Sequence, residues 1–166
     1  FFFVFILLSF LLIMSCGDND GGEGEITDDF DRKAMLADIA DGIILPAFED
    51  YTNKVETLNS FAHSFVANPT TEDLNLLRGY WLEAYKSWQY VSMFNIGKAE
   101  EISLRNFTNI YPANTEEIEE NIAEGSYNLE LPSKNDEQGF PALDYLLYGV
   151  ASDESAIVSK FSEEGL

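Results

Sequence analysis

The stretch that decides the fold is residues 70–97, which read TTEDLNLLRGYWLEAYKSWQYVSMFNIG. Apolar residues recur along it at steps of three and four: Leu74, Leu77, Trp81, Ala84, Trp88 and Val91. This spacing places them on one face of an α-helix, where the two tryptophans are expected to fill the core. Thr70 is suited to cap the start of the helix, and Gly97 is suited to end it. The pattern therefore predicts one long amphipathic helix.

A second apolar stripe at helical spacing runs through residues 30–66. Its members are Leu36, Ile39, Ile43, Phe48, Tyr51, Val55, Leu58, Phe61 and Phe65. Pro46 removes one intrahelical hydrogen bond, so we expect this helix to kink or restart near Leu45. The link between the two long helices, residues 68–70, is short. The helices are therefore expected to lie antiparallel.

Shorter helices are predicted in the remainder of the chain, over residues 102–107, 114–123, 141–148 and 153–161. Asn114 and Glu117 have the spacing of a capping box, and residues 125–138 are expected to form a polar loop. No segment alternates apolar and polar residues over the length of a strand, so no sheet is expected. The predicted fold class is all-α, an antiparallel helical bundle.

The composition indicates a folded, strongly acidic protein. The chain has 166 residues, with 9 Lys and Arg against 30 Asp and Glu, and a formal net charge of −21. Its 46% of hydrophobic and 14% of aromatic residues exclude a disordered acidic tail. The acid excess excludes a nucleic-acid-binding protein, because phosphate groups require clustered Lys and Arg. It favours cations or basic partners instead.

The first residues predict a secretory signal. Residues 1–15 carry no charge and are nearly all apolar, but the run is too short for a helix that spans a membrane. They end in Ile13-Met14-Ser15-Cys16, which resembles the lipobox of bacterial lipoproteins. The resemblance implies cleavage before Cys16 and a lipid on its thiol, which would hold the protein to a membrane. The alternative is an ordinary thiol that follows an apolar helix.

We expect three parts in the chain: a lipoprotein signal peptide at residues 1–15, a flexible acidic tether at 16–26 and a helical domain at 27–166. There is no initiator methionine and no basic residue before the apolar run, and residues 161–166 stop just after a helical pattern has begun. We therefore expect truncation at both ends. The acidic residues after Cys16 resemble the surface-export signals of Bacteroidetes lipoproteins, and a solvated linker is the plainer alternative. The expected location is the cell envelope, as an outer-membrane lipoprotein on the periplasmic or the outer side.

Signatures of ordinary enzymes are absent from the sequence. His63 is the only histidine, so a zinc motif with two histidines is impossible, and we expect His63 to be a partly exposed helix residue. The sequence also contains no glycine-rich phosphate loop and no Gly-x-Ser-x-Gly elbow.

The most distinctive stretch is residues 139–149, GFPALDYLLYG. Gly139 permits a close approach of its backbone to a neighbouring segment, and Pro141 suits the first turn of a helix. Asp144 lies one turn into this helix, among apolar residues. Its carboxylate is expected to be exposed near the helix N-terminus, paired with Lys or Arg, or a ligand of a hard cation.

Residues 139–149 resemble the Gly-x-His-x-x-Glu motif of imelysin-like proteins, with its aromatic-Leu-Leu-aromatic-Gly tail. The likeness extends to residues 44–48, the Trp81-x-x-Ala84 helix and the Tyr111-Pro112 turn. It implies an all-helical envelope lipoprotein built of two helical-bundle halves. This chain would be the N-terminal half, and the C-terminal bundle of the same protein would be its partner.

The family motif is altered at its two chemical positions. Imelysins were named as metallopeptidases, with the motif His and Glu proposed as metal ligands. Here Pro141 stands in place of the His and Asp144 in place of the Glu, and a proline side chain has no ligand atom. Asp144, with Glu137 and Asp136 from the preceding loop, would form only a weak oxygen site for iron or another hard cation.

Three functions follow from these features. The leading hypothesis is a non-catalytic, lipid-anchored envelope protein that binds a metal, a metal complex or a partner protein in iron uptake, as the resemblance implies. The second is an imelysin-type metallopeptidase, which would need ligands outside residues 1–166 or an unorthodox site around Asp144. The third is an interaction module on the cell surface whose acidic face docks a basic partner.

Overall fold

The computed structural model describes residues 29–162, and these residues form helices, turns and links without a strand. The predicted all-α class is confirmed. The chain divides into two compact units, residues 1–32 and 33–166. Within the described part, no helix has both the length and the apolar character that crossing a bilayer requires.

The first helical run consists of α2 (Arg32–Ile39), the π-helical turn η1 (Ala40–Ile44) and α3 (Leu45–Ala67). The backbone N–H of Leu45 donates to the carbonyl of Ala40, five residues earlier, which is the hydrogen bond of a π-turn. Pro46 then occupies the first turn of α3, where a missing N–H is tolerated. The expected kink or restart near Leu45 takes the form of this π-turn, through which Ile44 and Leu45 keep helical backbone angles.

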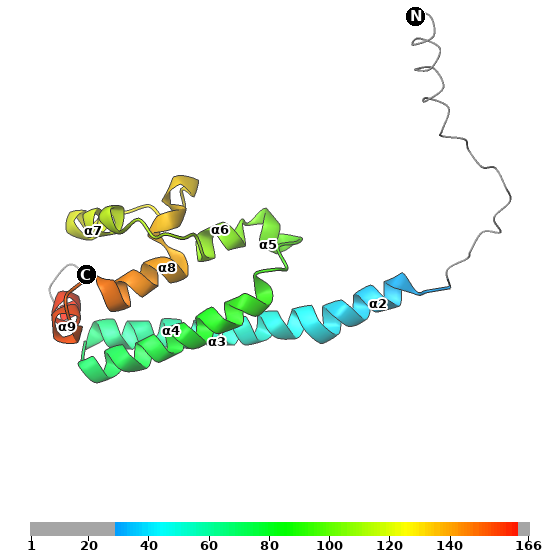
Figure 1. Cartoon of the computed structure of the whole chain (residues 1–166), viewed down its shortest axis with the longest axis horizontal. Coiled ribbons are helices and arrows are strands. Elements are labelled where there is room, and N and C mark those ends of the chain that lie inside the picture. The colour runs from blue at the N-terminus through cyan, green and yellow to red at the C-terminus, as the bar shows by residue number, and fades with distance from the viewer. Residues whose placement is uncertain (1–28, 163–166) are drawn as a thin grey trace, which may run out of the picture. The chain divides into compact units, whose positions relative to one another are not determined.

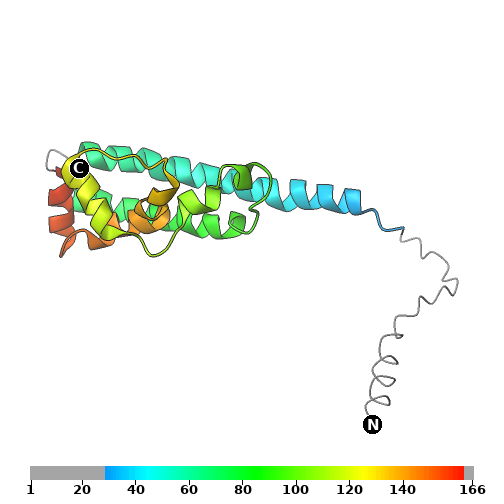
Figure 2. The ribbon, with the colours of Figure 1, turned by 90° about the horizontal axis from the view of Figure 1, so that it is seen from above.

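Helix α4 (Thr71–Val91) returns antiparallel to α3, and the two lie side by side in both views (Figures 1 and 2). The Thr70 hydroxyl oxygen accepts from the backbone N–H of Asp73 at 3.0 Å, so the predicted N-cap is confirmed. The predicted end at Gly97 is wrong. The helix already stops at Val91, and Gly97, with a φ of +57°, precedes the next short helix.

The remaining elements are α5 (Lys98–Glu101), α6 (Leu104–Thr108), α7 (Thr115–Glu124), the 3-10 helix η2 (Pro132–Glu137), α8 (Gly139–Asp144), the π-helical turn η3 (Tyr145–Gly149) and α9 (Glu154–Ser162). Figure 1 shows α8 above the α3–α4 pair, with α6 and α7 above α8. The side chain of Asn114 caps α7 through the N–H of Glu117, as predicted. The expected loop over residues 125–138 instead contains η2.

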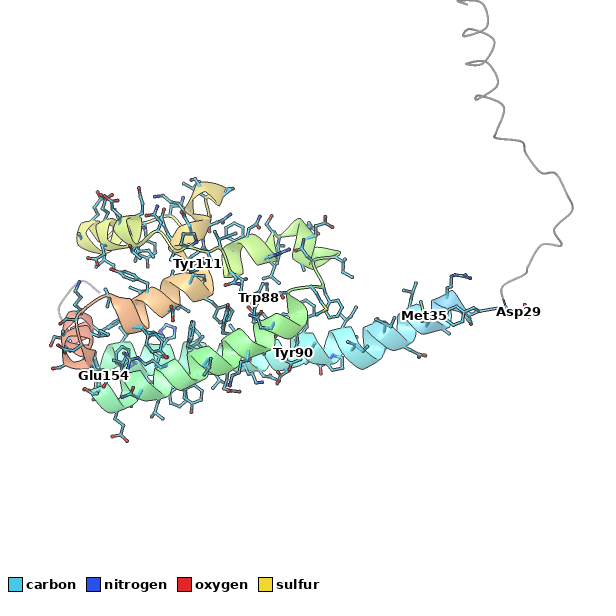
Figure 3. All side chains as sticks on the ribbon, in the orientation of Figure 1. Asp29, Met35, Trp88, Tyr90, Tyr111 and Glu154 are labelled. Atoms are coloured by element: carbon cyan, nitrogen blue, oxygen red, sulfur yellow. The ribbon has the colours of Figure 1, made fainter. Side chains whose placement is uncertain are left out.

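The core lies between α3, α4, the α8–η3 segment and α9. Its buried apolar residues include Leu58, Phe65, Leu74, Leu77, Trp88, Val91, Phe140, Leu147 and Ile157. Trp88 is only 2% exposed and packs on Tyr51, with ring centroids 5.5 Å apart. In Figure 3, Trp88 lies on the inner side of α4 and Tyr90 on its outer side. One face of α4 therefore belongs to the core, as its apolar stripe predicts.

Replacing Leu74 by Ala should lower the free energy of unfolding by about 2–5 kcal/mol, because Leu74 is fully buried and its loss leaves a cavity. Leu76, two residues along the same helix, is 46% exposed, so Leu76→Ala should change stability by less than about 0.5 kcal/mol. Urea denaturation followed by circular dichroism measures both. Equal effects of the two substitutions would contradict the orientation of α4.

Candidate functional site

A pocket of about 510 Å³ lies where α4, the link between α6 and α7, and the α8–η3 segment meet. We call it the aromatic pocket, because six of the residues that line it are Trp81, Tyr85, Tyr111, Phe140, Tyr145 and Tyr148. Tyr111, labelled beside α8 in Figure 3, is 86% exposed and precedes a cis peptide bond to Pro112. The three segments that resemble imelysin-like proteins around Trp81, Tyr111 and residues 139–149 thus converge on one cavity.

A close backbone contact at the start of α8 brings these segments together. Gly139 has a φ of +78°, and a Cβ at this position would lie 2.2 Å from the carbonyl oxygen of Thr108, the last residue of α6. Only glycine fits here, because it has no Cβ and adopts positive φ without strain. The prediction of a close approach at Gly139 is confirmed. The contact sets the link after α6 directly beside α8.

The inner wall of the aromatic pocket is held by ring packing and one hydrogen bond. The rings of Trp81 and Tyr85 are stacked, with centroids 5.4 Å apart, and Tyr85 packs on Phe140 at 5.3 Å. The indole N–H of Trp81 donates to the carbonyl of Phe140 at 3.2 Å, which ties α4 to α8. Trp81, expected only as a core residue, therefore packs against the core and also lines the pocket.

Among the described residues, Asp144 is the only charged one that lines the aromatic pocket. It is exposed, and among residues 29–162 no hydrogen bond or ion pair engages its carboxylate. Pro141, at the position of the family's motif histidine, is half-buried and lines the same pocket. Of the three environments predicted for Asp144, the structure thus shows an exposed carboxylate with no Lys or Arg partner in the described range.

Two tyrosines of the pocket lining each contact a charged side chain, Tyr145 that of Glu119 and Tyr148 that of Arg78. Burial, and then a hydrogen bond to Glu119, raise the pKa of Tyr145 to about 12, so its hydroxyl stays protonated at neutral pH. The guanidinium of Arg78 lies 4.4 Å from the ring centroid of Tyr148. The N–H groups of Arg78 already have partners. Nη2 and Nε donate to the carbonyl of Leu147 at 2.8 and 3.0 Å, and Nη1 donates to the carboxylate of Glu154 at 2.5 Å.

Glu137, a predicted metal-ligand candidate, belongs to a separate buried network. Its carboxylate lies 2.8 Å from the Lys134 ammonium and accepts from the Asn121 side-chain amide at 2.6 Å. Lys134 also pairs with Glu117 at 2.8 Å, and these two partners, Glu117 first, raise its pKa. Asp136 contributes its backbone carbonyl, which accepts from the N–H of Asn114. The network joins η2 to α7.

The three carboxylates proposed from the sequence as metal ligands are therefore not assembled. Asp144 lines the aromatic pocket, whereas Glu137 and Asp136 do not. Across the described residues 29–162, no group of three His, Cys, Asp or Glu side chains is placed to hold a metal ion. His63 is exposed on α3, as expected, and Cys16 lies outside the described residues.

Sequence reasoning missed Tyr85, Tyr145 and Tyr148 as parts of the pocket. A signal was present for Tyr85, because it lies four residues after Trp81 and so shares its helix face. The same signal was present for the other two, because Tyr145 lies four residues after Pro141 and Tyr148 four residues after Asp144.

Gly139→Ala should lower the free energy of unfolding by at least about 1–3 kcal/mol, since positive φ strains any side chain and the new Cβ collides with backbone. Gly79 is the matched control, because it lies in α4 with open space around it. Gly79→Ala should stabilise the protein by about 0.5–1 kcal/mol. Denaturant titration of both variants measures the two changes in the free energy of unfolding. A Gly139→Ala protein as stable as the parent would contradict the contact with Thr108.

Asn121→Ala should lower the free energy of unfolding by about 1.5–3 kcal/mol, because it removes the amide donor to the buried Glu137 carboxylate. Asn106, exposed on α6, serves as the control, and Asn106→Ala should have little effect. Thermal unfolding of the two variants tests whether Glu137 is a structural group. An unchanged midpoint for Asn121→Ala would argue against that role.

The comparison with protein families supports the resemblance found in the sequence. The family model described as "Peptidase_M75: Imelysin" matches residues 44–166. No curated protein and no solved structure gives a significant match. The matched range holds every segment that lines the aromatic pocket and covers more than half of the chain. The chain therefore belongs to the imelysin family.

Proposed function

We propose that this imelysin-family protein is a binding component of the cell envelope that takes up an organic metal complex, above all of iron, and catalyses no reaction. The observation that carries the proposal is the aromatic pocket, a cavity of about 510 Å³ whose lining combines six aromatic residues with one carboxylate and the neutral polar side chains of Asn109 and Thr115. Cavities of this size with a mostly apolar wall and a few polar groups are typical of sites for small organic molecules.

The donor atoms favour a complexed metal over a bare ion. A hard cation such as ferric iron or calcium takes six or more ligands, mostly oxygen atoms. Asp144 supplies the one carboxylate among the described lining residues, and the other lining oxygens, such as those of Asn109 and Thr115, are neutral. Pro141 offers no ligand atom, and Glu137 is engaged with Lys134. These residues do not fit a bare ion. A metal that arrives inside an organic chelator already has its ligands, and needs from the protein only a surface that fits the chelator.

The location in the envelope rests on the sequence. The lipobox-like segment before Cys16 and the acidic tether after it support a lipid anchor in the outer membrane, on the periplasmic or the outer side. A binding protein held there would pass its ligand to an envelope partner in metal uptake. The formal net charge of −21 favours partners with basic surfaces.

A metallopeptidase is the second candidate, and the peptidase name in the description of the matching family favours it. Its metal ligands would have to include residues outside 29–162, because the described residues hold no suitable group of three. Cleavage of unfolded casein by the metal-loaded protein, abolished by a chelator, would establish this function in place of binding.

Calorimetric titration of the purified chain tests the binding function. Ferric tris-hydroxamate chelates, which are neutral or cationic, should bind, whereas free ferrous, ferric, calcium and zinc ions should bind no tighter to the parent than to Asp144→Asn. Tyr85→Leu should weaken chelate binding about tenfold, because it keeps apolar bulk but removes a stacked ring from the wall.

The matched control is Tyr90→Leu on the same helix. Tyr90 is 70% exposed and does not line the pocket, so its loss should leave chelate affinity unchanged. Absence of chelate binding, or equal losses in the two variants, would refute the proposal that the aromatic pocket holds the complex.

A further inference from the structure

We propose that the ligand of the aromatic pocket carries a positively charged nitrogen group, an ammonium or a guanidinium, which lies between the carboxylate of Asp144 and the surrounding ring faces. This inference rests on the proposed binding function, since it names the chemistry of the ligand in the same pocket. It excludes polyanionic ligands and selects organic cations.

The first argument is an uncompensated charge. Asp144 is the only charged residue in the lining, and no Lys, Arg or His lines the pocket with it. Across residues 29–162 its carboxylate has no ion pair and no hydrogen bond. By contrast, Glu119, on the neighbouring helix α7, already accepts from Tyr145 and lies 3.7 Å from Lys160. A ligand cation would give Asp144 the partner that the described chain does not supply.

The second argument is the character of the wall. The face of an aromatic ring carries partial negative charge, and it attracts a cation placed within about 6 Å of its centroid. Trp81, Tyr85 and Tyr148 line the pocket around Asp144. Tyr148 already accepts such a contact from inside the protein, because the Arg78 guanidinium lies 4.4 Å from its centroid.

The third argument is the field of the whole protein. With 30 acidic against 9 basic residues, the chain attracts cations and repels anions at a distance. Nothing in the lining offsets this field. The hydroxyl of Tyr145 stays neutral, since its pKa is about 12, so the charge of the pocket at neutral pH is that of Asp144. The long-range field of the protein and the local charge of Asp144 therefore both favour a positively charged ligand.

Such a nitrogen cation has two possible sources, a small amine-bearing molecule or the side chain of Lys or Arg in a peptide. The recognition chemistry is shared, and it consists of one carboxylate with ring faces around it. Probes from each source, each paired with a neutral molecule of the same shape, separate the two.

Calorimetry with the full chain provides the test. 2-Phenylethylammonium should bind about tenfold or more tightly than 2-phenylethanol, which has the same ring without the charge, and 3-phenylpropionate should not bind. For the peptide source, N-acetyl-phenylalanyl-arginine amide is compared with its citrulline counterpart, in which the guanidinium is replaced by a neutral urea. The source whose charged member shows the larger preference over its neutral match is the one that the pocket accepts.

Two variants locate the effect. Asp144→Asn keeps the shape of the side chain and should abolish the preference for the charged probes, while binding of 2-phenylethanol stays unchanged. Glu100→Gln removes one negative charge from exposed α5, away from the pocket lining, and should leave the preference intact. Circular dichroism confirms that both variants remain folded.

Equal affinity for ammonium and alcohol, no binding of any probe, or equal losses in the two variants would overturn the inference. If ferric chelates bind but the charged probes show no preference, the binding function stands and the cation inference fails. If the charged probes bind through Asp144 and no chelate binds, the cation inference stands and metal-complex uptake fails.

Discussion

The arrangement of α6 and α8 above the α3–α4 pair depends on one contact between two backbones, the approach of Gly139 to the carbonyl of Thr108. A Cβ at residue 139 would lie 2.2 Å from that oxygen, so the contact exists only because the side chain is a hydrogen atom. It fixes the start of α8 against the end of α6. The link that carries Tyr111 then has to pass beside α8. This path places Tyr111 and its neighbours in the lining of the aromatic pocket.

Much of this fold could be predicted from the sequence because local signals agreed with packing. The apolar stripe and the Thr70 cap indicate the helix α4, and the short link to α3 requires the antiparallel pair that is found. Gly97 misled because its positive φ serves a turn at the start of α5 and not the end of α4. Residues 132–137 were missed as a helix because their order comes from the partners of the buried Glu137, which no local pattern reveals.

For the candidate site, the sequence predicted which chain segments contribute but not how their side chains are arranged. Gly139, Pro141 and Asp144 stood out in the sequence, but their chemical role depends on neighbours that are distant along the chain. Glu137 has a side chain that can bind a hard cation and lies in the segment just before the motif, yet Lys134 and Asn121 already occupy its oxygens. The sequence shows where the carboxylates are in the chain. Only the packing shows that Glu137 is paired with Lys134 and Asn121, whereas Asp144 is exposed.

The wall of the aromatic pocket draws on residues near positions 81, 111 and 144, which are brought together only by folding. A ligand that contacts all three has no equivalent site on the unfolded chain. Its binding is therefore linked to folding, and at a hundred times its dissociation constant it would add about 2.7 kcal/mol to the free energy of unfolding. Loaded and empty molecules would then differ in their resistance to proteases, so ligand supply could set how long each molecule survives.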